Sequence, residues 1–573
     1  MSNIGHVPEE LSVGRGDPAY MAHAYLTKVP VPAITPFIEA YTQPGDVVLD
    51  PFAGSGMTGV AAAICGRRAR QSDVSVLGQH IGRNYVNLVD PSLLHKHAEE
   101  VITATRESLQ NIYAIPCAHC GQSSQLAKAV WSILVSCTGC GHSVNYYRSL
   151  ESADWNKPSM RCPRCQTPVS SKNRRVGEEP VVDYVICECS TKQREQGATT
   201  SKSQIDLLGI EYPRVEITPD REMYKSSALG KNGLTTVDSF YSPRNLAVLG
   251  TLRQKIDTVP DERIRSKLLF AFTGCLTRAS KRYQWSRKRP LNAANANYYV
   301  APVFYEWNVF DLFERKVTSA ARADEWINEK RNGGLFSAEA DAIDVTYEIG
   351  SAEAINLPDD SIDYVFMDPP FGSNLFYADM ALFQEGWLGH FTDAAQEAVV
   401  DRSRGTSRSS TRYERLLTNA LHECKRVLRP HGRISMVFGN SSGKVWALVQ
   451  RAVAAAGLRI NPDELVILNK GQRSVKGLAS GFEHVATLDL ILTMTPSADA
   501  EEPRNSVSQS TVAAITQALA KSNWPTPSRL YLELLRHGIR NNWELDELDL
   551  RTVTDTLLQD GWSIEPKTGR LTR

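Results

Sequence analysis

The sequence has no long uncharged apolar run and no surplus of either charge. Its 573 residues include 64 Lys and Arg against 64 Asp and Glu, and no apolar run approaches the roughly 18–20 residues that a membrane helix needs. The N-terminal string MSNIGHVPEE carries acids where a secretory signal has basic residues before an apolar stretch. We therefore expect a cytoplasmic protein without a membrane partner, in which any contact to nucleic acid comes from a local basic patch.

Cysteine is scarce outside one segment, which holds eight of the eleven cysteines. In a large unexported chain, clustered thiolates are typical of metal sites rather than disulfides. The eight form pairs with metal-ligand spacing: Cys117 with Cys120, Cys137 with Cys140, Cys162 with Cys165, and Cys187 with Cys189. Apolar stretches lead into the second and fourth pairs, as in zinc ribbons. The spacing predicts two structural zinc sites of four thiolates each.

The spacing does not determine which pairs share a zinc ion. We expect sequential pairing, in which the first two pairs form one site and the last two the other. Nested pairing, first with fourth and second with third, is the alternative. His119 and His142 lie beside the knuckles and are expected to be bystanders.

The length of 573 residues predicts three or four domains. Part of the chain shows an alternation of strands and helices. It is present in two stretches and predicts an α/β fold with a mostly parallel sheet covered on both faces. Between them the alternation stops, which indicates an insert. The expected boundaries are 1–95 and 341–495 for the two halves of the α/β domain, 96–340 for the insert with zinc ribbons at about 115–190, 496–510 for a polar linker, and 511–573 for a small helical domain, for which a winged-helix-like form is one candidate.

A glycine-rich turn follows the first apolar strand, GDVVLD at 45–50. A strand that runs into Gly-x-Gly and then a helix places backbone amides and a helix N-terminus beside a ligand. The next strand ends in Asp73, where a ribose diol would lie. The alternative interpretation is a tight turn that binds no ligand. The full string of residues around the glycines makes this interpretation less favourable. The string is Asp50, Pro51, Phe52, Ala53, Gly54, Ser55 and Gly56.

A second string, Asp368-Pro369-Pro370-Phe371, directly follows the apolar strand IDYVFM. Such an acid at a strand end, stiffened by two prolines, can hold a flat group that bears an amine. Asp368 and the Pro369 carbonyl would accept its N–H bonds, and Phe371 would stack on it. The alternative, an Asp-Pro turn that leaves a strand, is common for two of these residues and uncommon for all four.

Together these strings resemble the S-adenosylmethionine-dependent DNA amino-methyltransferases, which methylate adenine N6 or cytosine N4. The resemblance covers about 20–100 and 340–495 and implies a Rossmann-like methyltransferase fold with S-adenosylmethionine bound at the glycine loop and Asp73. It also implies that Lys28 lies at the methionine end of the cofactor and Glu353 near its adenine. Asp at the first position of the tetrapeptide favours adenine over cytosine.

The resemblance implies double-stranded DNA as the partner, with the target base flipped out of the helix. A basic run interleaved with Tyr283 and Trp285 is a candidate for phosphate contact, and a solvated face is the alternative. A second basic stretch lies after the tetrapeptide. The candidates are Arg278, Lys281, Arg282, Arg287, Lys288 and Arg289 in the first run and Arg404 and Arg408 in the second.

The leading expectation is therefore a site-specific adenine-N6 DNA methyltransferase in restriction-modification or phage defence, with restriction or defence proteins as partners. Cytosine N4 is the nearest alternative. Methylation of RNA or of a protein glutamine amide is more remote, because such relatives typically carry Asn at the Asp368 position. A non-catalytic DNA-binding protein that keeps the fold and the zinc ribbons is the alternative from another class.

Overall fold

The computed structural model describes residues 5–572, apart from gaps at 111, 200–204, 206, 288–297, 334–342, 372–375, 399–409, 472–486, 499–504, 506, 522–525 and 566–568. The chain forms two compact units. The first comprises Met1–Leu88, Glu325–Leu375 and Asp393–Arg573, and the second comprises Val89–Asp324 and Phe376–Thr392. The insert expected at 96–340 thus begins and ends earlier, and a short segment after the tetrapeptide also belongs to the second unit.

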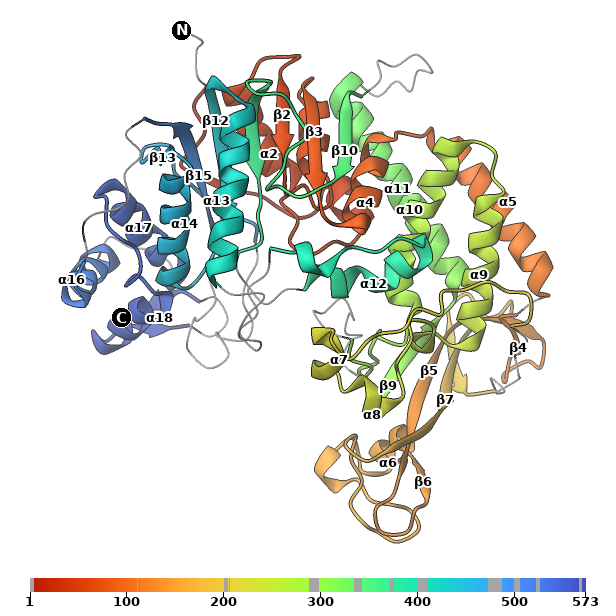
Figure 1. Cartoon of the computed structure of the whole chain (residues 1–573). Helices are drawn as coiled ribbons and strands as arrows, with labels where there is room; N and C mark the ends of the chain where they lie inside the picture. Colours follow the sequence, from red (N-terminus) through yellow and green to blue (C-terminus); the bar gives the residue numbers. More distant parts are fainter. Residues whose placement is uncertain are drawn as a thin grey trace. The chain divides into compact units, whose positions relative to one another are not determined.

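A mixed, mostly parallel sheet forms the centre of the first unit (Figure 1), which confirms the expected α/β class. Its strand order is β1-β14-β15-β12-β11-β2-β3-β10, with β13 beside β15. Within the described part of this sheet every antiparallel pair involves β15, which runs against β12, β13 and β14. The strands are β1 (Glu10–Ser12), β2 (Val47–Asp50), β3 (Arg68–Asp73), β10 (Val345–Ile349), β11 (Ile362–Met367), β12 (Leu428–Phe438), β13 (Leu458–Ile460), β14 (Val466–Asn469) and β15 (Asp489–Pro496).

Helices cover both faces of this sheet, as the alternation along β11 shows. Tyr364 and Phe366 face α2, where Phe366 packs on Phe37 with ring centroids 5.7 Å apart. Val365 and Met367 point to the other face and join the core that α13 and α14 cover. The helices are α1 (Pro18–Ala22), α2 (Val31–Tyr41), α3 (Met57–Ile64), α4 (Val76–Val86), α13 (Ser410–Val427) and α14 (Gly443–Ala455).

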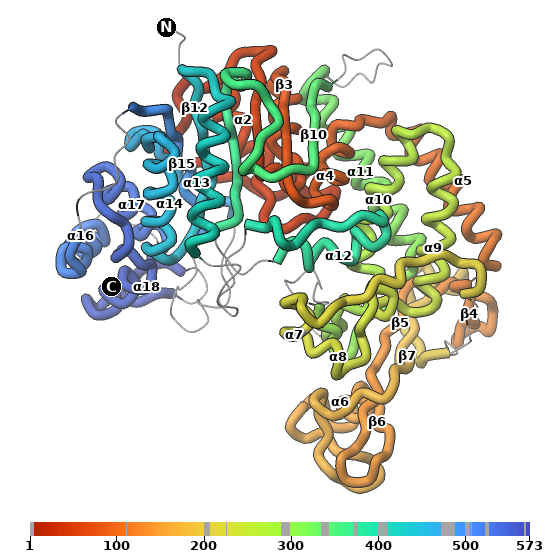
Figure 2. Tube along the Cα trace, viewed as in Figure 1, coloured from red at the N-terminus to blue at the C-terminus, as the bar shows by residue number. Residues whose placement is uncertain are grey.

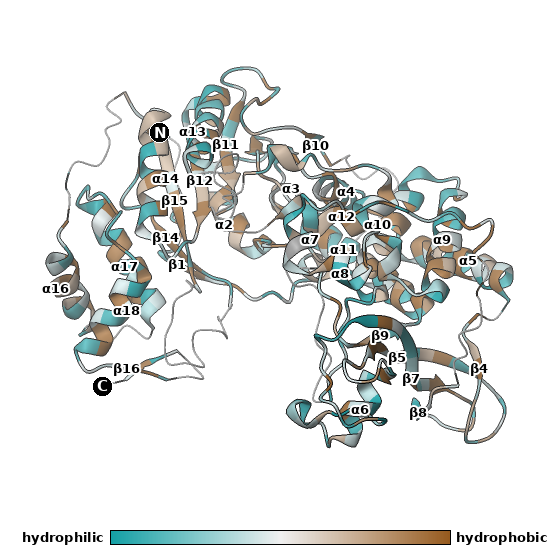
Figure 3. Cartoon of the chain, turned by 60° about the horizontal axis from the view of Figure 1, so that its bottom comes forward, coloured by the Kyte–Doolittle hydropathy of each residue, from teal (hydrophilic) through white to brown (hydrophobic). Residues whose placement is uncertain are grey.

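The C-terminal helices share this core instead of forming a separate domain. Leu530 and Leu557 are fully buried in the same apolar cluster as β12, and the hydrophobic colouring of the strands continues onto one side of these helices (Figure 3). The Gly443 amide donates to Asp549 Oδ1 at 2.8 Å. Val507, inside the expected linker, is also buried. The elements are α16 (Gln509–Ala520), α17 (Pro527–Arg540), α18 (Leu550–Gln559), β16 (Ser563–Ile564) and β17 (Leu571–Thr572).

The second unit combines a helical layer with a long antiparallel ribbon. Strand β5 has 14 residues and pairs with β7 along most of its length, while β4, β6, β8 and β9 extend the sheet. In Figure 2 the chain runs from α5 into this ribbon and returns to α9 and α10. The strands are β4 (Ala114–Pro116), β5 (Ser123–Ser136), β6 (Ser143–Asn145), β7 (Arg175–Ile186), β8 (Arg194–Gly197) and β9 (Val303–Trp307).

In the helical layer of the second unit, α5 packs on α9 and α10, and α12 packs on α10. Helix α9 contains residues 243–256. The helices are α5 (Pro91–Leu109), α6 (Tyr146–Ser152), α7 (Glu222–Ser226), α8 (Leu229–Asn232), α9 (Pro243–Asp257), α10 (Glu262–Ala279), α11 (Val309–Asn332), whose end belongs to the first unit, and α12 (Tyr377–Leu388). Among the described residues, no helix is long and apolar enough to span a membrane.

Candidate active site and cysteine tetrads

The carboxyl ends of the parallel strands gather the predicted polar residues at one edge of the central sheet. Asp50 ends β2, Asp73 ends β3 and Asp368 follows β11. These strands are parallel neighbours in the order β11-β2-β3. The structure therefore brings the two predicted strings together at an edge where open α/β sheets bind ligands.

Asp50 fixes the start of the glycine loop. Its Oδ2 accepts a hydrogen bond from Thr58 Oγ1 at 2.5 Å, and its Oδ1 accepts one from the Phe52 amide at 3.0 Å. Burial raises the pKa of Asp50 to about 7, because desolvation disfavours the carboxylate. Asp50 thus ties the loop to the first turn of α3.

Asp73 and Tyr347 hold the tip of the loop from another strand pair. Asp73 Oδ2 accepts from the Gly54 amide at 2.8 Å, and Oδ1 accepts from the Ser75 amide at 2.9 Å. The Tyr347 hydroxyl, on β10, donates to the Gly54 carbonyl at 2.7 Å. Burial raises the pKa of Asp73 as well. Tyr347 was not found from the sequence, since it lies almost 300 positions from Gly54.

Two glycines of the loop have backbone conformations that other residues rarely adopt. Gly54 has φ +47° and Gly56 has φ +79°. A Cβ on Gly56 would lie 2.6 Å from Gly82 Cα, and one on Gly54 would lie 3.0 Å from the Tyr25 ring. Pro51, Ala53, Ser55 and Gly56 are buried, whereas Phe52 and Gly54 are half-buried. The close packing of Tyr25 and α4 against the loop therefore requires glycine at both positions, whether or not a ligand is bound.

The two residues assigned by resemblance alone have different surroundings. Lys28 is buried, and its ammonium donates to the carbonyls of Tyr20 and His23 at 2.6 and 2.7 Å. It thereby fixes the segment before α2. Glu353 is exposed in the loop after β10, where Oε1 accepts from Asn419 at 2.9 Å.

Asp368 has an acceptor atom that no described residue uses. Its Oδ1 is buried and has no hydrogen-bond donor among the residues that the structure describes. Burial is the main cause that raises the pKa of Asp368 to about 8, and the nearby Lys470 ammonium opposes this shift. Pro369 is buried, while Pro370 and Phe371 are half-buried. An orphaned buried carboxylate oxygen is costly in a folded protein and marks a place where a donor is expected to bind.

Residues from α13, from β12 and from the segment that follows β12 hold the tetrapeptide in place. The Tyr413 hydroxyl donates to the Pro370 carbonyl at 2.5 Å, and Asn440 Nδ2 donates to the Phe371 carbonyl at 2.8 Å. The Phe371 ring packs on Phe438 at a centroid distance of 5.2 Å and an interplanar angle of 59°. These contacts orient the backbone and leave Phe371 only partly covered.

Lys470 and Asp489 complete the charged cluster and were missed by the sequence analysis. Lys470 follows β14 and Asp489 begins the antiparallel β15, so both lie at the same edge as Asp368. Lys470 Nζ lies 2.5 Å from Asp489 Oδ2. A Cβ at Gly439 would lie 3.4 Å from the Phe371 ring, with the Asp489 carboxylate even closer. Isolated Lys and Asp residues give no sequence signal, because only the strand order brings them together.

The eight clustered cysteines form two tetrads, which confirms that the pairs gather in fours. Sulfur distances in each tetrad fit tetrahedral zinc, for which a Zn–S bond of about 2.3 Å gives an S–S edge of about 3.8 Å. They do not fit a disulfide of about 2.05 Å. The Sγ distances are 3.8 Å for Cys117 and Cys189, 3.4 Å for Cys120 and Cys187, 3.5 Å for Cys137 and Cys165, and 3.7 Å for Cys140 and Cys162.

The grouping is nested, so the expected sequential pairing is wrong. Cys117 and Cys120 meet Cys187 and Cys189, whereas Cys137 and Cys140 meet Cys162 and Cys165. The reason is the β5–β7 ribbon: antiparallel strands bring the start of β5 to the end of β7, and the end of β5 to the start of β7. Backbone amides of His119 and Cys120 lower the pKa of Cys117 to about 6, which suits a thiolate ligand.

The first basic run is largely engaged inside the second unit. Arg282 is 2% exposed, and its guanidinium lies over the Phe383 ring at 4.6 Å; its burial corrects the expectation of a phosphate contact. Lys281 pairs with Glu178. Arg278 is exposed but stacks on Tyr283 at 5.0 Å.

Of the other predicted DNA contacts, one is exposed and four lie outside the described residues. Arg287 is exposed, with its guanidinium over the Trp155 ring at 5.3 Å. The remaining candidates, Lys288, Arg289, Arg404 and Arg408, lie outside the described residues.

Comparison with known proteins supports the glycine-loop half of the site. Residues 5–90 match the N6/N4 methyltransferase family model, whose description is "DNA methylase". A stretch of 42 residues, 7% of this chain, is 57% identical to "Putative methylase YubD" of Escherichia coli (strain K12). It spans 18% of that relative's length. The segment that supplies Asp50, the glycine loop and Asp73 is therefore similar to DNA methylases.

Proposed function

We propose that the protein transfers a methyl group from S-adenosylmethionine to the exocyclic amine of a flipped-out DNA base, adenine N6. The observation that carries the proposal is the buried, orphaned Oδ1 of Asp368 beside the loop that begins at Asp50. The match of residues 5–90 to DNA methylases supports the loop as the cofactor site. We place this activity in restriction-modification or phage defence, with restriction or defence proteins as partners.

The residues at the carboxyl edge fit the polar parts of the cofactor. Each carboxylate oxygen of Asp73 accepts one amide hydrogen and keeps a second lone pair, which suits ribose hydroxyls. Glu353 follows β10, the neighbour of β3, and would face the adenine end. Lys28 would act on the methionine end through the backbone that it fixes. When bound, S-adenosylmethionine supplies an electrophilic sulfonium methyl group.

Asp368 and the Pro369 carbonyl would prepare the amine for attack. The nitrogen lone pair is delocalised into the base ring, and two acceptors for its hydrogens favour a pyramidal nitrogen with a free lone pair. The nitrogen gains a methyl group and must release one proton. Asp368 Oδ1 would accept that proton, and a pKa of about 8 suits a general base that acts near neutral pH.

Phe371 would hold the flipped base. Its ring packs on Phe438 and is half-buried, and stacking of the base on its exposed part would offset part of the roughly few kcal/mol needed to unstack a base. The two cysteine tetrads would hold structural zinc, because four thiolates leave no open coordination position. The metal would stabilise the second unit and take no part in methyl transfer.

The test is to express the chain in a host that lacks DNA methylation and to sequence its modified bases. We expect N6-methyladenine in a fixed sequence context, its loss in Asp368→Ala, and its retention in Asp463→Ala, which removes an exposed acid of the same unit. Detection of N4-methylcytosine instead would support methyl transfer to a DNA amine and would correct the target base from adenine to cytosine. Unmodified DNA together with methylated RNA or protein would refute DNA as the substrate. Unmodified DNA from a protein that binds duplex but not S-adenosylmethionine would favour the non-catalytic alternative.

A further inference from the structure

The segment 137–175, which we call the Cys137 lobe, is strongly basic although the net charge of the whole chain is zero. It contains seven Arg and Lys and only two Asp and Glu, a surplus of five positive charges. Zinc held by four thiolates would carry a charge of −2, so a surplus of about three remains. A local field of this sign attracts polyanions even when the net charge of the protein is zero.

Most of these positive charges face solvent without an acidic partner. Arg148 pairs with Glu151 at 3.1 Å. No ion pair is recorded for the other exposed cations of the lobe within the described part of the chain. These are Lys157, Arg161, Arg164, Lys172 and Arg174. Surface cations without an acidic partner are available to a ligand, whereas the buried Arg282 is not.

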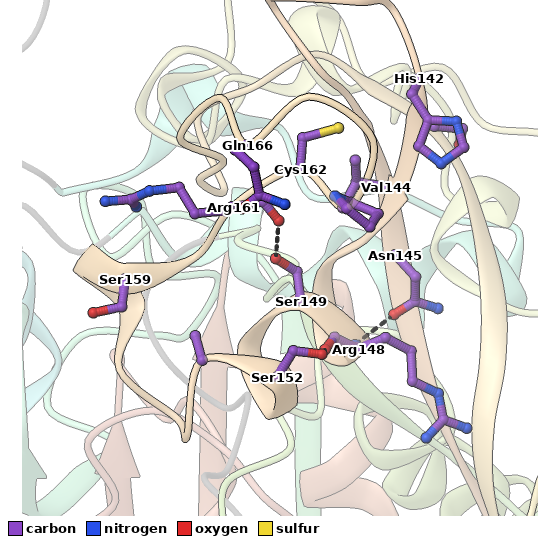
Figure 4. Close-up of a pocket in the computed structure, with 13 residues that line it drawn as sticks. His142, Val144, Asn145, Arg148, Ser149, Ser152, Ser159, Arg161, Cys162 and Gln166 are labelled. Carbon is purple, nitrogen blue, oxygen red and sulfur yellow. Dashed lines mark hydrogen bonds between the residues drawn. The ribbon is translucent and has the colours of Figure 1, made fainter.

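A hollow of about 520 Å³ opens on this lobe. Figure 4 shows Arg161 and Arg148 among the residues around it, together with Ser152, Ser159 and Gln166. The Arg161 Nη1 donates to the carbonyls of Pro158 and Met160 at 2.9 Å each, which fixes the guanidinium with its other nitrogens unused by these bonds. A hollow lined by guanidinium, hydroxyl and amide groups suits an anionic group such as a phosphate.

The tetrad gives this hollow a rigid frame. Cys162 belongs to the tetrad and lines the hollow, and the Ser149 hydroxyl donates to the Arg161 carbonyl at 3.2 Å. Metal binding would therefore fix the position of Arg161. The tetrad would then position a cation of the lobe in addition to stabilising the β5–β7 ribbon.

An aromatic cluster joins Trp285 to two rings of the lobe and carries one further cation. Tyr147, Trp155 and Trp285 lie with ring centroids 5.3–5.4 Å apart. Arg287 stacks on the Trp155 ring at 5.3 Å and is exposed. Arg287 thus extends the basic surface of the Cys137 lobe, although the run from which it comes is largely engaged elsewhere.

We propose that the Cys137 lobe binds the phosphodiester backbone of duplex DNA, with Arg161, Arg164 and Lys172 as principal contacts. The inference rests on the proposed function, which makes DNA the substrate. It assigns phosphate contacts to a surface that is not part of the methyl-transfer site. Cations that meet phosphates release counterions, so binding through this lobe depends steeply on salt. Phosphate contacts position a protein and carry no sequence information directly.

The test compares two variants of the full chain that remove three positive charges each. One is Arg161→Gln, Arg164→Gln and Lys172→Gln; the control is Lys96→Gln, Arg322→Gln and Lys330→Gln, all exposed on helices. Binding to a fluorescent duplex is measured against salt concentration. We expect the lobe variant to lower the slope of log K against log salt by about 2 to 3, at roughly 0.9 per contact, and the control to leave it unchanged.

A charge-retaining variant separates charge from structure. Arg161→Lys, Arg164→Lys and Lys172→Arg should bind duplex with the wild-type slope. If the Gln variant is poorly folded, acetylation of Lys157 and Lys172 in the wild-type protein replaces it: duplex should protect both, and equal acetylation with and without duplex would overturn the proposal.

Other outcomes distinguish this proposal from the proposed function. Wild-type protein that methylates DNA, with a Gln variant of unchanged affinity and slope, would overturn the lobe as the DNA surface and leave the methyl-transfer site intact. A Gln variant that methylates a different sequence would also overturn it, because those side chains would then contact bases. Wild-type protein that binds duplex through the lobe but transfers no methyl group would refute the proposed function alone.

Discussion

The Lys470 ammonium lies 2.5 Å from the Asp489 carboxylate, and this pair stands beside the orphaned carboxylate of Asp368. Burial raises the pKa of Asp368 to about 8, and Lys470 is the principal charge that opposes the shift. The Asp489 and Asp368 carboxylates in turn raise the pKa of Lys470, despite its burial. The protonation of Asp368 therefore depends on residues from three strand ends.

The first prediction concerns pH. If Asp368 must be ionised to accept the amine proton, kcat/KM for DNA should rise about tenfold per pH unit below its pKa and level off above about pH 8. A steady-state profile from pH 6 to 9.5 measures this. A flat profile would show that the protonation of Asp368 does not limit the reaction.

The same shift predicts how stability changes with pH. The folded-state pKa of Asp368 exceeds its ordinary 3.8, so the folded protein holds an extra proton between about pH 4 and 8, and stability falls as pH rises through that window. Asp368→Asn should therefore raise Tm above pH 8, where the wild type buries a charge. Thermal unfolding at pH 5 and 9 tests this: the gain should be larger at pH 9.

A third prediction tests Lys470. Lys470→Met removes the cation that lowers the pKa of Asp368, so it should move that pKa, and with it the activity profile, upward by about one pH unit. Lys444→Met removes an exposed lysine of α14 and should leave the profile in place. Equal profiles for the two variants would mean that Lys470 acts only as a structural partner of Asp489.

Zinc content tests the nested tetrads. The wild type should contain about two zinc ions per chain. Cys117→Ser with Cys187→Ser should remove one ion, because both ligands belong to one tetrad. Cys117→Ser with Cys137→Ser should remove both, with a larger fall in Tm, because structural zinc stabilises the folded state directly. Sequential pairing would give the opposite counts.

How much the sequence predicted depends on how local each feature is. The glycine loop, the tetrapeptide and the cysteine pairs are contiguous strings, and their strands lie within a few residues of the predicted bounds: β11 ends at Met367, directly before Asp368. The edge that joins Asp50 to Asp368 followed from alternating strands and helices. The metal pairs followed from spacing alone.

Features that depend on strand order or burial were not predicted. Lys470 and Asp489 meet only because β15 runs antiparallel beside β14. The nested tetrads depend on the β5–β7 register, and Arg282 appeared as a surface cation because a charge run does not reveal which member is buried. The C-terminal helices appeared separate because a polar stretch precedes them, whereas Leu530 packs into the main core.

The loop offers a test that separates cofactor binding from chemistry. Gly54→Val places a branched side chain at φ +47°, against the Tyr25 ring, and should lower S-adenosylmethionine affinity and methyl transfer together. A variant that binds the cofactor normally would show that the loop is not part of its site.

The measurement that tests the central claim most directly uses Asp368→Ala, with Asp463→Ala as the control. Transfer of labelled methyl from S-adenosylmethionine to duplex DNA and cofactor affinity are measured on the same preparations. We predict that Asp368→Ala abolishes transfer while cofactor affinity stays within a few fold, because the glycine loop and the tetrapeptide are separate elements. Undiminished transfer in Asp368→Ala, or a loss of cofactor binding equal to the loss of turnover, would contradict the account.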